Sequence, residues 1–499
     1  MPIRIDNQLT AQKLVPKIER LFELSAAKIL AIEKSWKPSN GTPVFTVKGR
    51  YTSRGWTEWT QGFQFGSALL QFEATGEKKF LEIGRRNTVE KMATHVSHVG
   101  VHDHGFNNIS TYGNLLRLMR EGKIPFNEHE KNFYELALKV SGAVQAARWT
   151  KTADGNGFIY SFNGPHSLFI DTLRSLRSLA VAHRLGHVLM GERDQKISLL
   201  QRLVEHATTT ARYNVYYGKG RDAYDVCGRT AHESIFNVND GSYRCPNSQQ
   251  GYSPFSTWTR GLAWAILGFA EQLEFLKSIS ENELDHVAHN LPWNHIIPPR
   301  QKAVQGLPDF TLTQILLNAA IATADFYLES GCRDGVPMWD TGAPRLDGLN
   351  DYFHKPADPF NFLEPVDSSA AAIAAQGLFR LGTHLIMIYG KRAVPKIPRS
   401  AERVRARIVG LGCRYRQASL TIANTLFSEP YLSTNSKHQG LILHSVYHRP
   451  NGWDYIAPGQ KIPNGESSMW GDYHARELAL LLWREARREK YLTFFGGVD

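Results

Sequence analysis

The chain is poor in cysteine and has no long apolar run. Its 499 residues include four cysteines, at positions 227, 245, 332 and 413, and none forms a closely spaced pair. This spacing argues against a zinc site or a disulfide framework. The first residues, MPIRIDNQLTAQ, hold no apolar signal segment, and no stretch is apolar over the length of a membrane span. We therefore expect a cytoplasmic protein that does not bind membranes.

Linkers, low-complexity tracts and charge blocks are also missing, so we expect one domain covering residues 1–499. The chain carries 58 Lys and Arg residues against 47 Asp and Glu residues, a formal net charge of +11. A basic balance suits nucleic acid, an anionic membrane or an acidic substrate. The basic residues are dispersed and no nucleic-acid motif accompanies them. An acidic substrate is therefore the expected partner, rather than nucleic acid.

Helical periodicity is the dominant pattern along the chain. Residues 1–50 contain an amphipathic segment at 11–35, where Pro16 favours a start near residue 15, followed by a loop that continues to residue 58. Strand patterns are few and short, and 441–447 is the best of them. The chain therefore predicts an all-α fold. Further helical segments cover residues 57–77, 79–98, 108–121, 130–148, 166–187, 194–218, 255–276, 309–329, 367–390, 401–425 and 473–487.

The stretch QGYSPFSTWTRGLAWAILGF, residues 250–269, has the residue types of a sugar-binding site. Ser253 and Pro254 favour the start of a helix. Arg260 and Trp264 are four residues apart and share one helical face. A guanidinium there would bind a carboxylate, and an indole would stack on a sugar ring. The alternative is an amphipathic core helix with one solvated arginine.

Two aspartates are candidates for proton chemistry. Asp103 stands between His102 and His104, just before a helical segment, and is either a helix cap or a ligand-binding carboxylate. The two histidines are also a candidate metal pair, although no third ligand is evident. Asp171 interrupts an apolar run, where a carboxyl should be harder to ionise, as a general acid requires. The alternative is an exposed Asp171 paired with Arg174.

Several separated motifs resemble, in the same order, those of the unsaturated glucuronyl hydrolases, glycoside hydrolase family 88, which is related to family 105. Residues 250–264 resemble the QGYxxxSxWxRGxAW signature. The residues around Asp103 resemble the HDxGF motif, and those around Asp171 resemble an FxDxL-like sequence. His232 precedes Gln250 by 18 residues, the interval found in the family. The resemblance runs from about residue 50 to the C-terminus.

The resemblance implies an (α/α)6 barrel of six helical hairpins and a hydrolase that needs no cofactor or metal. Its substrate would be an oligosaccharide ending in the 4,5-unsaturated uronic acid that polysaccharide lyases leave at the non-reducing end. Asp171 would protonate C4 and then activate the water that adds at C5, while Asp103 would hold the ring hydroxyls. The implied substrate-binding residues are His232, Gln250, Arg260, Trp264 and Trp59.

Two departures from the family pattern keep other activities open. Family members often have His where Gln249 stands and Gln where Leu262 stands. The alternatives are a hydrolase of saturated glucuronides, a polysaccharide lyase on the same barrel, and a non-catalytic sugar-binding protein. Ser433, Ser436 and Lys437 lie where some relatives recognise a sulfate, but with different spacing. No pattern indicates an oligomeric state.

Overall fold

The computed structural model describes residues 2–55, 58–291, 311–390 and 399–496. Within these residues, six helical positions form a closed inner ring, in which each position contacts the next and the last contacts the first. Two positions are broken helices, and one of these contains a π-helical turn, Ile109–Gly113. The inner helices are α2 (Gln61–Thr75), α5 (His104–Asn108) with α6 (Asn114–Arg120), α8 (Thr172–Ser175) with α9 (Arg177–Arg184), α11 (Thr259–Lys277), α15 (Ser368–Tyr389) and α17 (Met469–Arg487).

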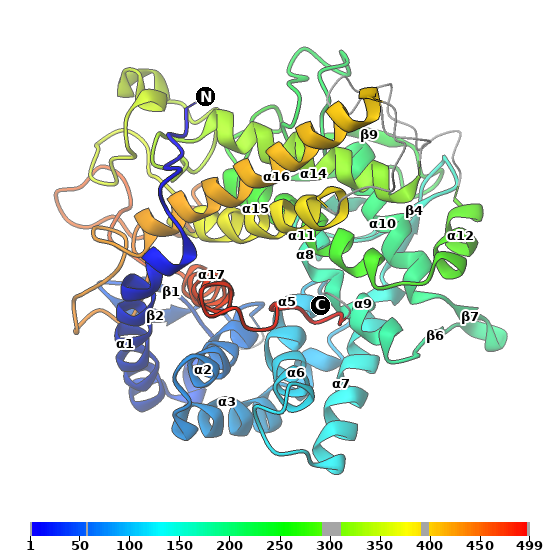
Figure 1. Ribbon diagram of the computed structural model, residues 1–499, viewed down its shortest axis with the longest axis horizontal. Coiled ribbons are helices and arrows are strands. Elements are labelled where there is room, and N and C mark those ends of the chain that lie inside the picture. Colours follow the sequence, from blue (N-terminus) through cyan, green and yellow to red (C-terminus); the bar gives the residue numbers. More distant parts are fainter. Residues whose placement is uncertain (1, 56–57, 292–310, 391–398, 497–499) are drawn as a thin grey trace.

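An outer layer of helices covers this ring. In Figure 1, α14, α11, α15 and α16 lie in one layered group, and α1 lies close to α17. With six inner and six outer positions in the described part of the chain, the fold is the predicted (α/α)6 barrel. The outer helices are α1 (Ala11–Ser35), α3 (Lys78–Lys91), α7 (Glu128–Ala147), α10 (Leu199–Tyr213), α14 (Leu312–Ser330) and α16 (Arg399–Leu426), with the short α4 (Ala93–Val96) and α12 (Glu281–His289) beside them.

The core explains why the inner helices are so apolar. One hydrophobic cluster includes residues from Ile3 to Phe495. That the whole chain forms one domain stays a prediction. Every residue of α11 from Thr259 to Leu276 is buried. Among the described helices, α15 alone has the length and apolar composition of a membrane span, and 78% of that window is buried. Burial on all sides by neighbouring helices is typical of a core helix.

Four small antiparallel sheets connect the helices. The three-stranded sheet matters most for the site, because its first strand leads into α8 and its second begins directly after His232. The sheets pair β1 (Pro43–Val47) with β2 (Arg50–Ser53), β3 (Trp149–Lys151) with β4 (Gly157–Ile159), β6 (Leu189–Met190) with β7 (Lys196–Ile197), and β5 (Ser167–Phe169) with β8 (Glu233–Phe236) and β9 (Tyr243–Asn247).

Several predicted boundaries are wrong. The first helix begins at Ala11 and contains Pro16, because the Thr10 side chain accepts a hydrogen bond from the Lys13 amide and caps the helix there. The segment predicted at 166–187 begins as strand β5 and becomes helical at Thr172. The segment predicted at 309–329 starts outside the described residues.

Two further corrections concern strands and the central helix. A hairpin, β1–β2, occupies the region predicted as loop, whereas 441–447 forms only isolated bridges. Helix α11 begins at Thr259 and not at Ser253–Pro254, because Trp258 makes a β-bridge with Asp340 and so stays extended. These contacts join residues that are distant in sequence, so local propensity does not determine where the elements begin.

Candidate active site

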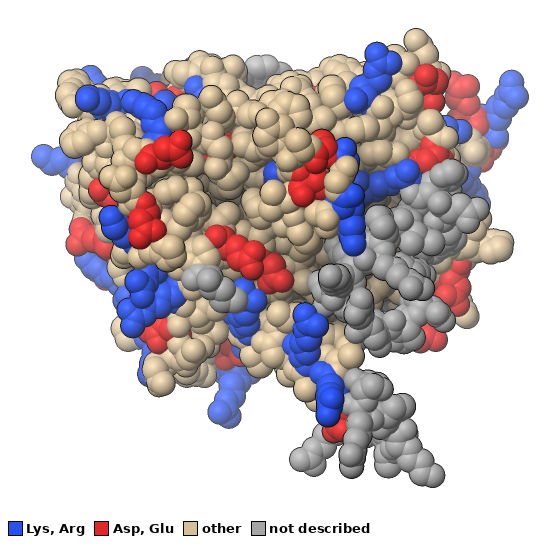
Figure 2. Space-filling model, turned by 90° about the horizontal axis from the view of Figure 1, so that it is seen from above, with Lys and Arg blue, Asp and Glu red and all other residues tan. Residues whose placement is uncertain are grey.

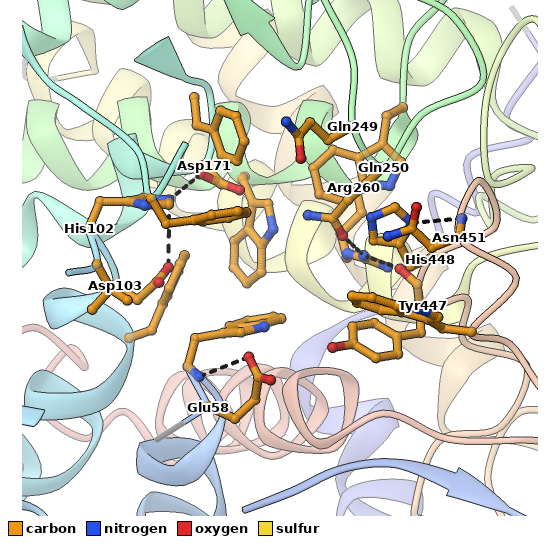
Figure 3. Close-up of a pocket in the computed structure, with 18 residues that line it drawn as sticks. Glu58, His102, Asp103, Asp171, Gln249, Gln250, Arg260, Tyr447, His448 and Asn451 are labelled. Atoms are coloured by element: carbon orange, nitrogen blue, oxygen red, sulfur yellow. Dashed lines mark hydrogen bonds and ion pairs between the residues drawn. The ribbon is translucent and has the colours of Figure 1, made fainter. Parts of the chain in front are cut away.

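A cavity of about 430 Å³ lies where the amino-terminal ends of several inner helices meet (Figure 3). This volume lies in the usual range for small-molecule sites. Helix amino termini carry partial positive charge, so this end of the barrel favours an anionic ligand. Six of the seven predicted site residues line the cavity: Trp59, Asp103, Asp171, Gln250, Arg260 and Trp264.

One wall of the cavity joins the two predicted aspartates through a histidine. His102 Nε2 lies 3.1 Å from Asp171 Oδ1 and 3.6 Å from Asp103 Oδ1 (Figure 3). Asp103 is 8% exposed and Asp171 is 7% exposed, so both carboxyls are nearly buried. Asp103 occupies the cap position of α5, but its side chain makes no capping hydrogen bond. Its carboxylate is therefore directed to the site and not to the helix.

Close packing of two inner helices brings these groups together. A Cβ on Gly105 would lie 2.1 Å from the backbone oxygen of Ser175 in α8, so only glycine fits there. The Gly105 amide donates to the Ser175 hydroxyl at 2.9 Å. That contact fixes the start of α5 against α8, and Asp103 and Asp171 are the residues that precede these two helices.

The electrostatics of this wall correct one prediction. Burial raises the pKa of Asp171, but the hydrogen bond and charge of His102, with the charges of His232 and Arg260, lower that pKa below its usual value. Burial raises the pKa of Asp103; His102 opposes this, Asp171 adds to it, and the net pKa is raised. Burial lowers the pKa of His102, but the two carboxylates raise it above its usual value. Asp171 is thus easier to ionise than the apolar run around it predicts.

The two alternative roles suggested by local sequence are also wrong. Arg174 pairs with Glu271 and Glu477 and not with Asp171. His104 is held away from the cavity, where its ring nitrogens contact the Ser141 hydroxyl and the His98 carbonyl. In the described part of the chain, no group of three or more His, Cys, Asp and Glu side chains is placed to hold a metal ion.

His232, the seventh predicted residue, lies behind the cavity wall. Its Nδ1 accepts hydrogen bonds from the backbone amides of Gln249 at 3.0 Å and Gln250 at 3.3 Å. These hydrogen bonds explain why His232 and Gln250, 18 residues apart in the sequence, occur together. Burial lowers the pKa of His232 to about 4, so the ring is neutral and its proton lies on Nε2. That buried donor has no partner among the described protein atoms, as is expected of a group that meets a ligand.

The opposite wall is built around Arg260. Its Nη2 donates to the Gln250 amide oxygen at 2.6 Å and to the Tyr447 carbonyl at 2.8 Å. Its Nη1 contacts the Val446 carbonyl and lies 3.3 Å from Asp367 Oδ2. The guanidinium is buried, so the alternative of a solvated arginine on a core helix is wrong. Arg260 is already held by protein groups, and Gln250 is the contact that faces the cavity.

Aromatic rings form much of the remaining surface. Trp264 packs against Phe106 with ring centroids 4.9 Å apart, and Trp59 stacks on Trp470 at 5.0 Å. Of the two departures from the family pattern, Gln249 lines the cavity, whereas Leu262 is buried in α11 outside the lining. A difference in ligand preference would therefore arise at Gln249 rather than at Leu262.

Sequence reasoning missed part of the lining. From the sequence, His102 is a candidate only for metal binding. Its place beside Asp103 in HDHGF is the signal that could have indicated a role in the site. Glu58, Tyr447 and Trp453 were not predicted as site residues. They enter the cavity from the segment before α2 and from a loop near the C-terminus, and no local spacing links these two segments.

The cavity combines aromatic rings, which suit the faces of a sugar, with carboxyls that can accept hydrogen bonds from its hydroxyls. Two known proteins resemble this chain over much of its length. The chain is 24% identical over 336 residues to the unsaturated glucuronyl hydrolase of Formosa agariphila, covering 66% of this chain and 64% of that protein. It is 24% identical over 445 residues to the unsaturated glucuronyl hydrolase of Bacillus sp. strain GL1, covering 87% of this chain and 89% of that protein. No protein-family model matches the chain.

Solved structures of the same group share the fold. An unsaturated glucuronyl hydrolase specific for heparin superposes with a TM-score of 0.66 and 18% identity, covering 95% of this chain and 98% of its own. The Bacillus sp. GL1 enzyme gives a TM-score of 0.62 with 21% identity, covering 94% and 97%. The predicted resemblance to the unsaturated glucuronyl hydrolases is confirmed, and so is the helical barrel.

Proposed function

We propose that this chain hydrolyses the bond between a non-reducing-end 4,5-unsaturated uronic acid and the next sugar of an oligosaccharide. The main observation in support is the wall in which Asp171 and Asp103 both contact His102 Nε2, in a cavity at the amino-terminal ends of the inner helices. Curated relatives over most of the chain carry the name of this activity. The roles of the individual residues below are part of the same proposal.

The uronate would bind between the two walls. Its carboxylate would accept a hydrogen bond from the side-chain amide N–H of Gln250, which Arg260 Nη2 orients by donating to the Gln250 amide oxygen at 2.6 Å. The free Nε2–H of His232 would donate to a ring or carboxylate oxygen. Trp264 and Trp59 would contact the faces of the sugar, because aromatic rings suit its apolar C–H surface. Asp103 would accept hydrogen bonds from the ring hydroxyls.

The reaction needs a group that donates a proton to the substrate and then accepts one from water. The Asp171 carboxyl would transfer its proton to C4, leaving positive charge at C5 that the ring oxygen shares. Water would then lose a proton to the Asp171 carboxylate and bond to C5. The resulting hemiketal would open between C5 and the ring oxygen to give a ketone, which leaves a hemiacetal at C1. That hemiacetal would collapse to an aldehyde and release the second sugar as an alcohol, so one water is consumed and Asp171 is regenerated.

Substrate binding would itself prepare the acid. In the empty cavity, His102 and its neighbours hold the pKa of Asp171 below its usual value. A uronate carboxylate bound in the same cavity adds a like charge and raises that pKa. The two carboxylates raise the pKa of His102. The proton on its Nε2 would lie in the 3.1 Å hydrogen bond to Asp171 and be available to that carboxyl. His102 is thus a positioning residue that links the two acids.

An ordinary glycosidase would use its two carboxyls differently. Such enzymes place two carboxyls on opposite sides of the scissile bond. Here both carboxyls contact one nitrogen atom, so they lie together on one wall. The proposed steps use Asp171 and water alone, and we propose a cytoplasmic enzyme that requires neither metal nor cofactor and has no nucleic-acid partner.

Ultraviolet absorbance tests the proposal. Incubation with an unsaturated uronyl disaccharide should abolish the absorbance of its conjugated alkene, in the presence of chelator as well as in its absence. Absorbance that rises on intact polysaccharide would identify a lyase. Unchanged absorbance together with glucuronate release from a saturated glucuronide would identify an ordinary hydrolase. Loss of activity on chelation, with stoichiometric zinc in the protein, would refute the metal-free mechanism.

A further inference from the structure

We propose that Glu233 is a positioning residue, which fixes the ring of Phe162 over His102 and excludes water there. The inference rests on the proposed function, because His102 makes the hydrogen bond to Asp171, the residue that would transfer the proton. Glu233 lies in β8, directly after His232, and is fully buried. It is not among the residues that line the described cavity, so it would act on the reaction through other residues.

Phe162 covers one face of His102. The two rings lie nearly parallel, 19° apart, with centroids separated by 6.0 Å. Phe169 meets the same imidazole edge-on at 5.5 Å. His102 is 2% exposed and Phe162 is 56% exposed, so the phenylalanine takes the contact with solvent that the histidine lacks. Electrostatic interactions are stronger where water is excluded, so this cover strengthens the 3.1 Å hydrogen bond between His102 and Asp171.

Phe162 lies in a short loop whose two ends are joined. The Ser161 amide donates to the Ser167 carbonyl at 2.9 Å. The later arm of the loop is held by Thr150, whose hydroxyl donates to the Pro165 carbonyl at 2.6 Å. The earlier arm carries Phe162, and its position over His102 requires a separate contact with the barrel.

Glu233 supplies that contact through Asn163, the residue after Phe162. Its Oε1 accepts hydrogen bonds from Asn163 Nδ2 at 3.1 Å and from the Ser167 hydroxyl. The Asn163 amide donates to the Ser161 hydroxyl at 3.1 Å, and that oxygen lies 2.6 Å from the Ser167 hydroxyl oxygen. Because the Ser167 proton goes to Glu233, Ser161 must donate to Ser167. These groups therefore form a closed ring of hydrogen bonds, in which each bond strengthens the next.

The same carboxyl holds a second segment of the cavity wall. Glu233 Oε2 accepts a hydrogen bond from Asn247 Nδ2 at 2.6 Å, and Asn247 lies two residues before Gln249, which lines the cavity. All three partners of Glu233 donate, and a carboxylate has acceptors only, so the position suits glutamate better than glutamine. A buried donor that loses its acceptor is costly, so the ring of hydrogen bonds holds the loop in one place.

The test exchanges the donor and the acceptor between Asn163 and Glu233. Asn163→Asp places a second carboxyl against Glu233 and should release the loop. Its kcat/KM on an unsaturated disaccharide should fall by roughly tenfold to 100-fold, the usual cost of a slightly misplaced site. Adding Glu233→Gln to Asn163→Asp should restore most of this loss, because the new amide can donate to the new carboxylate.

Asn239→Asp is the matched control. It adds the same charge at an exposed turn between β8 and β9, away from the hydrogen-bonded ring. Acidic and basic side chains are interspersed over the face shown in Figure 2, and one added surface charge should leave the activity unchanged. In a Phe162→Ala background, Asn163→Asp should have little further effect on kcat/KM, because the ring that it would release is absent.

A second measurement follows water at His102 and needs no turnover. The C2 hydrogen of an imidazole exchanges slowly with deuterium from the solvent, and mass spectrometry measures the exchange for single histidines. Exchange at His102 should be faster in Asn163→Asp and in Phe162→Ala than in the wild type, and should return to the wild-type rate when Glu233→Gln is added to Asn163→Asp. His474, which is buried in α17, is the internal control and should not change.

Each outcome decides a separate point. Equal activity and exchange in Asn163→Asp and Asn239→Asp, or a double variant no better than Asn163→Asp, overturns the role of Glu233. A full effect of Asn163→Asp in the Phe162→Ala background overturns it as well. Should Asn163→Asp fail to fold, Asn163→Ala removes one donor only and must give the faster exchange. A wild type without turnover that shows the expected exchange pattern refutes the proposed function and supports the position of Phe162.

Discussion

Buried carboxyls occupy two regions of this barrel, and their partners differ. Midway along the inner helices, Glu477 lies 2.7 Å from Arg174 and 3.7 Å from Arg177, and Glu271 contacts Arg174 as well. At the amino-terminal ends of the helices, Asp103 and Asp171 share one histidine. The first region pairs each carboxylate with guanidinium groups, whereas the second has two acids for one base.

The pKa values record this difference. Burial raises the pKa of Glu477, but Arg174, Arg177 and His474 lower it to about 2, so its charge is fixed at any ordinary pH. In the cavity, the pKa of Asp103 is raised by burial while that of Asp171 is lowered by His102. A carboxylate paired with guanidinium groups keeps its charge and stabilises the fold. Two carboxyls that share one histidine can exchange a proton with it. The comparison assigns the first region to the fold and the second to the chemistry.

The largest expected effect is at Asp171. Asp171→Asn keeps the size of the side chain but cannot transfer a proton, so kcat should fall by roughly 100- to 10,000-fold. Steady-state kinetics on an unsaturated disaccharide measure this, and the thermal midpoint should stay close to that of the wild type.

Asp103→Asn is the matched comparison in the same wall. It should lower activity by misplacing the sugar, and the rise in KM should be larger than in Asp171→Asn. More than about a tenth of wild-type kcat in Asp171→Asn, judged on the same scale, would remove Asp171 from the chemistry.

A substitution in the cluster of Glu477, Arg174 and Arg177 should lower the stability of the fold and leave the rate of the reaction almost unchanged. Glu477→Gln leaves Arg174 and Arg177 buried with one counter-charge fewer, and breaking a buried pair costs about 3–5 kcal/mol. Denaturant unfolding should show this loss, while kcat of the folded fraction changes little. A variant as stable as wild type but catalytically inactive would contradict the division into two regions.

Acid should abolish the difference between Glu477→Gln and the wild type. The pKa of Glu477 is about 2 in the folded chain against an ordinary value of 4.5, so its ionised form stabilises the fold. That contribution is complete above pH 4.5 and is lost as the pH falls toward 2. Unfolding free energies of the two proteins should therefore converge over this window. A difference that stays constant from pH 6 to about pH 2 would show that packing, and not charge, holds Glu477.

The sequence predicted the parts of the fold that depend on local periodicity. Helices such as α7 and α15 have apolar residues at helical spacing and polar breaks at their ends, so they could be located to within a few residues. The start of α11 could not, because Trp258 is held extended by Asp340, which follows it by 82 residues. The motif resemblance, and not periodicity, indicated which helical architecture they form.

Six of seven predicted site residues line one cavity, but their roles were only partly predictable. The ionisation of Asp171 depends on His102, which is 69 residues away, and so the apolar neighbours in sequence gave the wrong direction. Tyr447 is positioned by Asp454, which accepts a hydrogen bond from its amide. The contact between His102 and Asp171 forms only in the folded barrel, where residues distant in sequence meet.

The smallest expected effects are at Arg260 and Gln250, in the cavity wall opposite Asp171. Arg260→Lys keeps the charge but loses the planar fork, so it cannot serve both Asp367 and Gln250. KM should rise roughly tenfold and the thermal midpoint should fall by several degrees, since the loss of hydrogen bonds from a buried charged group costs about 1.5–3 kcal/mol. Kinetics and thermal unfolding of the same preparation measure both effects.

Gln250→Ala separates the two contributions. It removes the cavity-facing partner of Arg260 at 2.6 Å and leaves the contact with Asp367 intact. KM should rise while the thermal midpoint stays within about two degrees of wild type, because a side chain at the cavity surface contributes little to the core. If Arg260→Lys melts early but binds the unsaturated sugar normally, and Gln250→Ala also binds it normally, then this wall serves only to hold α11 against the C-terminal loop. The uronate would then have to be recognised from the histidine side of the cavity.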